Sequence, residues 1–549
     1  MRKTVSVLAS LSLATLTGPM LAGTASADTT TTAVPRKAAA MRSAGVQAAL
    51  AAHAARATSA TSATAQAAAS PSYLPSMLEC TARGVVNVKL DCDSRLPNNE
   101  PDVNVDPRNP QHLVASSNDY DSNGDEFYTS FDGGRTWRTG YMSLEDDGRI
   151  GSDPVTVFDA KHDTVIHSSL NFKFDGSDGD LVVSRSKDGG LHWGEPVVVS
   201  DGQGVDTAPT QLFNDKEWMV TDNNPRSPHY GRTYLTWSLF VSHHGNYASS
   251  AIYESHSDDG GRTWTPRQEI SGSDRTCTFQ TTGRANRCDE NQFSVPTVAP
   301  DGSVYVAFQN GQHEAAWERG EQFEDQYMVV RSHDGFRTFS SPVPVVDLED
   351  GSRDYPTNVN DRQTLTGMQA RVNSAGNIVA KPNGQLAIAF SDNRAGKHDV
   401  DNPVTNTNVY LMTSFDGIHW DGPTAVDTSG GDQWFPWVDA NPVTGQLGVL
   451  YNSEVDRGRY VAKLAVGRSG GGFHSTRVSA GVSNADNSVF FQSHVKDCYR
   501  CTTFFGDYIR LAYGRDGSAN MVWTDMSKTI SYGGLTAKGQ FVYFARLRP

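Results

Sequence analysis

Short stretches in which apolar and polar residues alternate recur along the chain from about residue 98 onward. In the first of them, at 102–106, Val103 and Val105 stand between polar residues, and similar stretches follow at 112–116 and 126–130. An alternation of period two is typical of a β-strand that buries one face. Turn-forming Pro, Gly, Asn and Asp residues separate the stretches. The pattern therefore predicts short antiparallel strands joined by tight turns.

An eight-residue motif follows the third strand of this group and then returns along the chain. Ser-Phe-Asp-Gly-Gly-Arg-Thr-Trp at 130–137 has close copies at 186–193 and 257–264, and weaker ones at 332–339 and 414–420. The Asp can accept hydrogen bonds from backbone N–H groups just ahead, the glycines allow positive φ, and the final aromatic ring can be buried between neighbouring sheets. The motif therefore predicts a structural turn, with acceptors at Asp132, Asp188, Asp259, Asp334 and Asp416.

The spacing of these turns defines a repeating unit of four antiparallel strands, the third of which leads into the motif. Further units begin near residues 153, 218, 294, 370, 435 and 507. Four-stranded units of this kind are the blades of a β-propeller, so the fold class is all-β. The last unit is one strand short, and residues 84–90 could supply that strand by pairing with 541–547, which would close the ring and cover its edges. We expect seven blades, with six as the alternative.

The motif resembles the Asp-box, Ser-x-Asp-Gly-Gly-x-Thr-Trp, of sialidase-like β-propellers, and the resemblance covers the chain from about residue 98 to its end. It implies that the Asp-boxes lie on outer hairpins away from the active site. It also implies an exo-sialidase-like glycoside hydrolase, with an Arg-containing clamp for a carboxylated sugar and a Tyr nucleophile. Of the family's Phe/Tyr-Arg-Ile-Pro motif this chain keeps only Arg149 and Ile150.

Three regions divide the 549 residues. Residues 1–27 have a basic start, an apolar stretch and a small-residue cleavage sequence, which together are typical of a secretory signal peptide. Residues 28–78 are rich in Ala, Thr and Ser and contain too few large apolar residues to form a core, so a linker or pro-segment is expected. Residues 79–549 form the propeller. A secreted, extracellular protein is predicted.

The formal net charge of −15 argues against nucleic acid or an anionic membrane as the main partner. Outside the signal peptide no stretch is long and apolar enough to span a membrane, so membrane insertion is not expected. An extracellular glycan or glycoconjugate is the expected partner, and the protein is expected to be a monomer.

Six cysteines form three close pairs in sequence. A secreted chain favours disulfides, and local pairing is the simplest of the 15 possible connectivities. The pairs are Cys80 with Cys92, Cys277 with Cys288, and Cys498 with Cys501. The last pair could instead be a redox motif or half of a zinc site, although neither a second Cys-x-x-Cys nor a thioredoxin-like pattern accompanies it.

Candidate chemistry is expected where the inner strands begin, because ligands of propellers bind at that end of the central channel. Carboxylates could act as the acid and the nucleophile or base of glycoside hydrolysis, Trp could stack on a sugar ring, and Arg could pair with a carboxylated sugar. The catalytic candidates are Asp153, Glu217, Arg371, Asp507 and Tyr508. The substrate-binding candidates are Glu100, Arg149, Trp237, Asp392, Arg394 and Trp434.

Two interpretations of this set remain open. In the first, the protein is a secreted glycoside hydrolase that acts on glycans. In the second, it is a non-catalytic propeller that binds polysaccharide or another protein, and the acidic residues only satisfy the N–H groups of turns. The incomplete Arg-Ile motif favours the second interpretation.

No cofactor is required by either interpretation, but one loop resembles the first half of a calcium-binding loop. Asp119, Asp121 and Asn123 have the Asp-x-Asp-x-Asn spacing, with Gly124 after them, whereas Ser130 stands where a bidentate Glu would be needed. A structural calcium at this loop is therefore possible, and a flexible acidic turn is the alternative.

Overall fold

The computed structural model describes residues 78–81, 87–92 and 97–548, apart from gaps at 121, 147, 206, 279–284, 314–324, 352, 358–361, 400, 469, 489–503 and 533–534. The predicted signal peptide and nearly all of the predicted linker lie outside the described residues, so both stay predictions.

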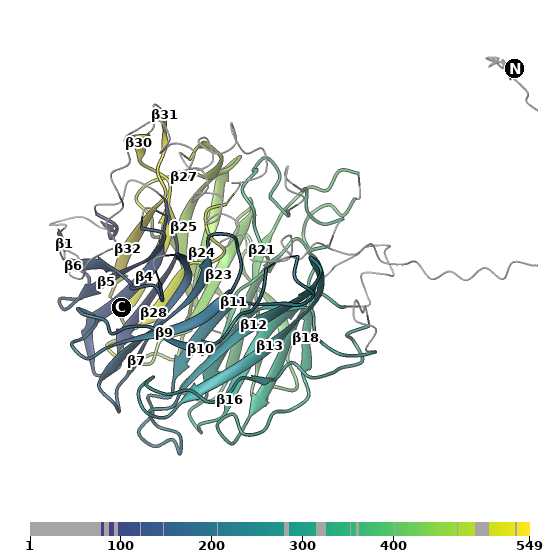
Figure 1. Ribbon diagram of the computed structural model, residues 1–549. Helices are drawn as coiled ribbons and strands as arrows, with labels where there is room; N and C mark the ends of the chain where they lie inside the picture. Colours follow the sequence, from purple (N-terminus) through teal and green to yellow (C-terminus); the bar gives the residue numbers. More distant parts are fainter. Residues whose placement is uncertain are drawn as a thin grey trace, which may run out of the picture. The chain divides into compact units, whose positions relative to one another are not determined.

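The described residues form eight antiparallel sheets, and seven of them are the blades of a propeller. Figure 1 labels strands of these sheets. Blade 1 contains β3 (Asn98–Asp106), β4 (Asn109–Asp119), β5 (Gly124–Ser130) and β6 (Thr136–Tyr141), with β1 (Leu78–Thr81) added beside β6. Blade 2 contains β7 (Arg149–Asp159), β8 (Thr164–Lys173), β9 (Asp180–Ser186) and β10 (Val197–Ser200). Blade 3 contains β11 (Gln211–Thr221), β12 (Thr233–His243), β13 (Asn246–Ser257) and β14 (Gln268–Glu269).

The remaining blades repeat this plan. Blade 4 contains β15 (Asn291–Val298), β16 (Val304–Asn310), β17 (Gln326–Ser332) and β18 (Val343–Asp347), and blade 5 contains β19 (Asn377–Ala380), β20 (Leu386–Asp392), β21 (Asn408–Ser414) and β22 (Asp421–Asp427). Blade 6 contains β23 (Gln433–Ala440), β24 (Leu447–Asp456), β25 (Arg459–Gly467) and β26 (Phe473–Arg477), with β27 (Ser483–Asn484) and the 3-10 turn η1 (Ala485–Asn487) after it. Blade 7 contains β28 (Arg510–Tyr513), β29 (Ala519–Asp525), β32 (Phe541–Leu547) and β2 (Val88–Lys89), and β30 (Thr529–Tyr532) pairs with β31 (Leu535–Lys538) in a separate hairpin.

The first strand of each blade faces the centre of a closed ring. These inner strands contact one another in the order β3, β7, β11, β15, β19, β23 and β28, and β28 contacts β3 again. The ring is closed by β2, which pairs with β32 through Val88 opposite Phe544 and Lys89 opposite Tyr543. The prediction of seven blades, and of a last blade completed by an N-terminal strand, is confirmed.

Both faces of a blade are buried against its neighbours, and the Asp-box rings take part in this packing. Trp137 of blade 1 packs edge-on against Phe544 of blade 7, with 5.0 Å between the ring centroids. Trp193 of blade 2 packs against Phe127 of blade 1 in the same way at 5.8 Å. Gly134 has φ +83°, and a Cβ there would come within 2.1 Å of the Phe544 ring, so only glycine fits this turn.

The Asp-box carboxylates accept the hydrogen bonds that their sequence predicts. Asp259 Oδ1 accepts from the backbone N–H groups of Arg262 and Thr263, both at 2.9 Å, and its Oδ2 accepts from the Thr263 hydroxyl at 2.7 Å. These turns join the third and fourth strands, whereas the inner strands begin at the opposite end of each antiparallel sheet. The topology therefore separates the Asp-boxes from the end at which chemistry is expected.

Replacing Asp259 by alanine should lower the free energy of unfolding by about 1 kcal/mol at pH 7, because three hydrogen bonds lose their acceptor. Burial alone would raise the pKa of Asp259, but hydrogen bonds from Thr263, Ser257 and Arg262 lower it to about 2. The unfolded value is about 3.9, so this stabilisation is present above about pH 4 and is lost as the pH falls through 2. Equilibrium denaturation of wild type and Asp259→Ala should show a difference that narrows between pH 4 and pH 2. A difference that stays constant over this range would contradict the assigned role.

One predicted disulfide is described in full. Cys277 and Cys288 are bonded, with their Cα atoms 5.3 Å apart. Cys92 is also disulfide-bonded, and the side chain of its predicted partner Cys80 lies outside the described residues. Cys498 and Cys501 lie there too, so those two pairings stay predictions. Among the described residues, no helix has the length and apolar character needed to cross a membrane.

Candidate functional site

Five inner strands begin with the same irregularity, which directs side chains toward the centre. Glu100, Asp153, Lys216, Phe293 and Phe435 have φ between +53° and +58°, and the pairing register of each strand shifts at that point. Such β-bulges re-aim side chains, and positive φ outside glycine is strained. The same bulge in five blades therefore marks the beginning of the inner strands as a specialised region.

Four carboxylates of different blades gather at this end of the ring, and all are at most 1 % exposed: Glu100, Asp153, Glu217 and Asp507. Glu100 accepts from Asn118 Nδ2 at 2.7 Å and from the backbone N–H of Asp507 at 3.0 Å. Asn118 Oδ1 in turn accepts from the backbone N–H of Asp153 at 2.8 Å. Blades 1, 2 and 7 are thereby linked through one small network.

Burial makes these carboxyl groups hard to ionise. Burial raises the pKa of Glu217 well above its usual value, and the neighbouring Asp153 raises it further. Burial also raises the pKa of Glu100, together with Asp153 and Asp507. The pKa of Asp507 is raised by burial, although Arg371 opposes that shift. A cluster of this kind can keep one carboxyl protonated near neutral pH, as a general acid requires.

A lysine and a tyrosine lie among the carboxylates. Lys216 Nζ is 3.7 Å from the ring centroid of Tyr508 and 4.7 Å from that of Trp218. Burial raises the pKa of the Tyr508 phenol well above its usual value, and Glu100, Asp153 and Glu217 raise it further. The negative charge of these carboxylates therefore makes the Tyr508 proton harder to remove.

Two tryptophans and an arginine pack next to Tyr508. Trp218 of blade 3 contacts Trp437 of blade 6 with 4.5 Å between centroids, and the Arg510 guanidinium lies 5.0 Å from the first ring and 4.7 Å from the second. Arg510 Nη1 lies 3.5 Å from Asp102 Oδ1 in blade 1. Because these side chains come from four blades around the ring, they fill its interior.

Two arginines approach the carboxylates from the segment that joins β18 to β19. Arg371 Nη2 lies 3.2 Å from Asp507 Oδ2. Arg362 is close enough that burial and the Arg371 guanidinium lower its pKa to about 10, whereas Asp507 opposes the shift. Bridges between Thr357 and Gln363 and between Thr364 and Arg371 fold this segment back on itself and bring its two arginines together. We call 348–376 the arginine segment.

Neighbouring blades hold the arginine segment in place. Thr366 and Thr405 exchange hydrogen bonds from each backbone N–H to the other's hydroxyl, both at 2.9 Å. The carboxylate of Asp486, in η1, accepts from the backbone N–H groups of Gln369 at 2.9 Å and Ala370 at 3.0 Å. Loops of blades 5 and 6 therefore help to determine where Arg362 and Arg371 lie.

Several buried polar atoms in this cluster have no hydrogen-bond partner within the protein. They include both carboxyl oxygens of Glu217, Asp153 Oδ2, Tyr508 Oη and Arg371 Nη1. Leaving a buried polar group unpaired costs about 1–3 kcal/mol, and more when the group is charged. Four residues on blades 2, 3 and 7 and on the arginine segment incur this cost in one region, which is expected where a ligand supplies the missing partners.

A cavity of about 10 Å³ lies within the cluster and is lined by Lys216, Phe293, Val295, Ala375, Gly376, Phe435, Pro436, Trp437, Asp507 and Tyr508. A space of this volume holds about one water molecule. A sugar ring could enter only if some lining side chains moved.

The structure thus brings together all five catalytic candidates predicted from sequence, and Glu100 with them. The rings of the two tryptophans that were predicted to stack on a sugar are buried. Trp237 is fully buried in the hydrophobic core and stacks on Tyr253, and Trp434 is 1 % exposed and packs edge-on against Tyr460. Both lie on strands whose faces are covered by neighbouring blades, so a sugar could reach either ring only if the packing around it moved, and their role in stacking stays a prediction.

The other predicted binding residues have guanidinium or carboxylate groups that are already paired. Arg149 contacts Glu145 at 3.3 Å, Asp146 at 3.2 Å and Asp180 at 2.8 Å. Arg394 binds Asp392 through Nε at 2.9 Å and Nη2 at 2.6 Å, and its guanidinium lies 5.1 Å from the Tyr410 ring. These pairs stabilise loops, and their predicted role in substrate binding stays a prediction.

The predicted calcium loop is only partly described, because Asp121 lies outside the described residues. Asp119 Oδ2 accepts from the backbone N–H of Ser122 at 2.9 Å, and Asn123 has φ +64°. Calcium binding at this loop therefore stays a prediction.

The sequence did not point to three cations of the cluster: Lys216, Arg362 and Arg510. Lys216 immediately precedes the predicted Glu217 and occupies the bulge position that Glu100 and Asp153 occupy in their blades, so the alignment of inner strands could have identified it. Arg362 lies in a segment that has no counterpart in the other units. No repeat pattern could have indicated it.

No protein-family model and no curated protein sequence matches the chain. Among solved structures, the chain is similar to a leech intramolecular trans-sialidase, with 11 % identity, 80 % of this chain and 83 % of that chain covered, and a TM-score of 0.42. It is also similar to the sialidase NanB from Streptococcus pneumoniae, with 9 % identity, the same coverage and a TM-score of 0.42. An α-L-arabinofuranosidase from Fusarium graminearum matches with 14 % identity, 70 % and 98 % coverage and a TM-score of 0.44.

Proposed function

We propose that this protein is a secreted glycoside hydrolase that acts on glycans containing a carboxylated sugar. The observation that carries the proposal is the group of unpartnered buried atoms in the central cluster. Glu217 and Asp153 supply carboxyl oxygens, Tyr508 a phenol oxygen and Arg371 a guanidinium nitrogen. This set contains the acid, the base and the anion-binding group that hydrolysis of an acidic glycoside requires.

The two carboxyl groups have different roles. Glu217 is the general acid, because burial and Asp153 keep it protonated, and its proton passes to the leaving oxygen as the glycosidic C–O bond breaks. Asp153 accepts the proton of the group that attacks the anomeric carbon, for which Tyr508 is the candidate. Water then attacks the anomeric carbon and gives a proton to Glu217, while the bond from that carbon to the Tyr508 oxygen breaks and Asp153 returns a proton to this oxygen. The sugar is released with the hydroxyl of the water, and the cluster regains its starting protonation.

Arg371 binds the carboxylate of the sugar. Its Nη2 is held by Asp507 at 3.2 Å, which leaves the buried Nη1 to donate to a ligand. Arg362 adds a second positive charge beside it. Two guanidinium groups close together are suited to an anion and have no evident use for a neutral sugar.

The second candidate is a propeller that binds acidic glycans without cleaving them, and the small cavity favours it. A volume of about 10 Å³ admits no sugar ring, so the arginines could bind an anionic group at the surface while the carboxylates stay buried. A panel of aryl glycosides decides between the two candidates. It should include a sialoside, a glucuronide and the matching glucoside. Release of the aryl group from the acidic members supports hydrolysis, whereas binding on a glycan array without release supports the second candidate.

Arg371→Lys should raise KM for an acidic aryl glycoside by about 10-fold or more and change kcat less, because lysine cannot contact Asp507 and a substrate carboxylate together. The KM for the matching neutral glucoside, if it is cleaved, should not change. Steady-state kinetics on a glucuronide and a glucoside measures both values. Arg232→Lys is the matched control, because Arg232 pairs with Asp258 at 2.7 and 2.6 Å outside the cluster. An equal effect of Arg371→Lys on both substrates would contradict the anion-binding role.

A further inference from the structure

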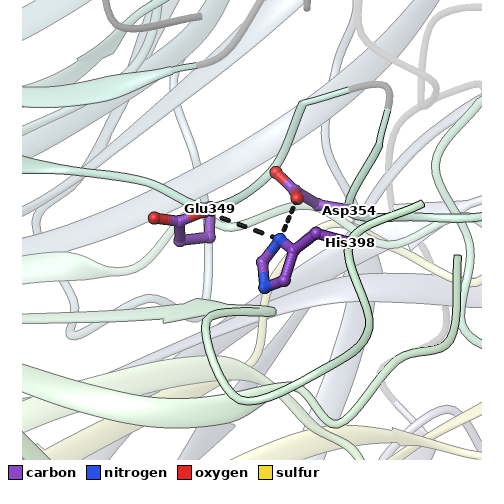
Figure 2. A group of neighbouring side chains, drawn as sticks. All are labelled: Glu349, Asp354 and His398. Carbon is purple, nitrogen blue, oxygen red and sulfur yellow. Dashed lines mark hydrogen bonds and ion pairs between the residues drawn. The ribbon is translucent and has the colours of Figure 1, made fainter. Parts of the chain in front are cut away.

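A second group of polar side chains lies where the arginine segment meets the segment between β20 and β21. Glu349 and Asp354 belong to the first segment and His398 to the second, and Figure 2 shows both carboxylates beside the imidazole. His398 Nδ1 contacts Asp354 Oδ1 and lies 3.6 Å from Glu349 Oε2. One ligand atom of each residue lies within 4.8 Å of the others.

Main-chain hydrogen bonds hold the two segments together at this point, so the group does not depend on its own side-chain contacts. The backbone N–H of Asp399 donates to the carbonyl of Arg353 at 2.9 Å. The backbone N–H of Asn393 donates to the carbonyl of Glu349 at 3.1 Å. The backbone therefore presents the three ligand atoms to one another before any ligand binds.

Two carboxylates face one ring nitrogen, and that nitrogen carries at most one hydrogen, which it can donate well to only one of them. Asp354 is fully buried, and its Oδ2 already accepts from the backbone N–H of Gly351 at 2.8 Å. The His398 side chain is 30 % exposed, which leaves a route from solvent.

We propose that Glu349, Asp354 and His398 bind a divalent transition-metal cation. One imidazole nitrogen and two carboxylates suit Zn²⁺ or Mn²⁺, whereas Ca²⁺ and Mg²⁺ prefer sites made of oxygen alone. A cation at about 2.0–2.2 Å from each ligand places the ligand atoms about 3–3.5 Å apart. The separation of His398 from Glu349 is close to this range, and the His398–Asp354 contact must lengthen. Water completes the coordination.

The cation would fasten the arginine segment to blade 5. Glu349 and Asp354 lie in the same segment as Arg362 and Arg371, and His398 lies in the neighbouring insertion. Binding should therefore stabilise the fold around the arginines whatever reaction they serve. This inference is independent of the proposed glycoside hydrolysis, because its test measures metal binding directly.

The full untagged protein is dialysed against a chelator, transferred to metal-free buffer and titrated with ZnCl₂ by calorimetry at pH 7.5. We expect one Zn²⁺ per chain, and a rise of about 3 °C or more in the melting temperature at saturation. His398→Gln should weaken Zn²⁺ binding by at least about 10-fold and abolish the rise. Because protons compete with the cation for the ligand atoms, wild-type affinity should be lower in acidic buffer.

His419→Gln is the matched control. His419 Nδ1 also pairs with an aspartate, Asp416, at 2.8 Å, but among the described residues this pair belongs to no group of three potential metal ligands. This variant should bind Zn²⁺ as wild type does. If His398→Gln does not fold, Glu349→Gln provides the same comparison without removing the His398–Asp354 pair. Absence of Zn²⁺ binding by wild type, or equal affinity in wild type and the ligand variants, would show that the group is only an ion pair and would overturn the proposal.

Discussion

Glu217→Gln should lower kcat on a cleaved acidic aryl glycoside by at least about 10²-fold, the lower end for loss of a general acid. Glutamine has nearly the same shape but cannot give up a proton to the leaving oxygen. The raised pKa of Glu217 also predicts how kcat depends on pH. Wild-type kcat should fall as the pH rises through that pKa, because the carboxyl loses its proton. This alkaline limb should disappear in Glu217→Gln.

Glu254→Gln is the control for this experiment. Glu254 lies in blade 3 as Glu217 does, is 1 % exposed and has a pKa raised by burial, but its partner is His256 at 3.3 Å. It should keep wild-type kcat within about twofold. A leaving group of low pKa needs little protonation, so the defect of Glu217→Gln should shrink on a nitrophenyl glycoside relative to a phenyl glycoside. If the variant matches wild type on both, Glu217 is not the acid and the assignment of roles within the cluster fails.

Sequence alone predicted the parts of this molecule that repeat. The residues of the Asp-box specify one kind of turn, because they supply a hydrogen-bond acceptor, two positions that allow positive φ and an aromatic ring. The copies of the motif therefore located the hairpins, and the hairpins located the strands. The beginnings of the inner strands could then be counted off, which is why Asp153, Glu217 and Asp507 were found although they are far apart in sequence. Ring closure brings such positions together without any local motif.

What the sequence could not show has equally physical causes. Trp237 and Trp434 lie on strands of a fold in which both faces of every sheet are buried, so alternation could not show which rings pack in the core. Arg362 and His398 belong to insertions present in one blade each. Their positions depend on hydrogen bonds to other loops, such as the two hydrogen bonds between Thr366 and Thr405. The sequence of one blade does not show which loop will supply such partners.

The closing strand β2 contains only two residues, but the residues that flank it in sequence also contact blades 6 and 7. Leu90 is fully buried among Val542 and Phe544, and its backbone N–H donates to the Val542 carbonyl at 2.9 Å. Asn87 donates to the Val478 carbonyl at 3.1 Å, just beyond β26. The segment at 87–90 therefore joins the outer edge of blade 7 to blade 6.

Removal of β1 and β2, in a chain that begins at residue 93, should lower the melting temperature by about 10 °C or more or cause aggregation, because the edge of β32 loses its partner and apolar side chains are exposed. A chain that begins at residue 73 should melt within about 1 °C of wild type, since the predicted linker contributes no core. Thermal melts and light scattering on both chains measure this.

Leu90→Ala tests the same contact without removing Cys92, and it should lower the free energy of unfolding by about 2–5 kcal/mol. Val197→Ala is the control, because Val197 lies in β10 and is 39 % exposed. It should lower the free energy of unfolding by less than about 0.5 kcal/mol. Equal tolerance of the two truncations, with a neutral Leu90→Ala, would refute closure of the ring by the N-terminal segment.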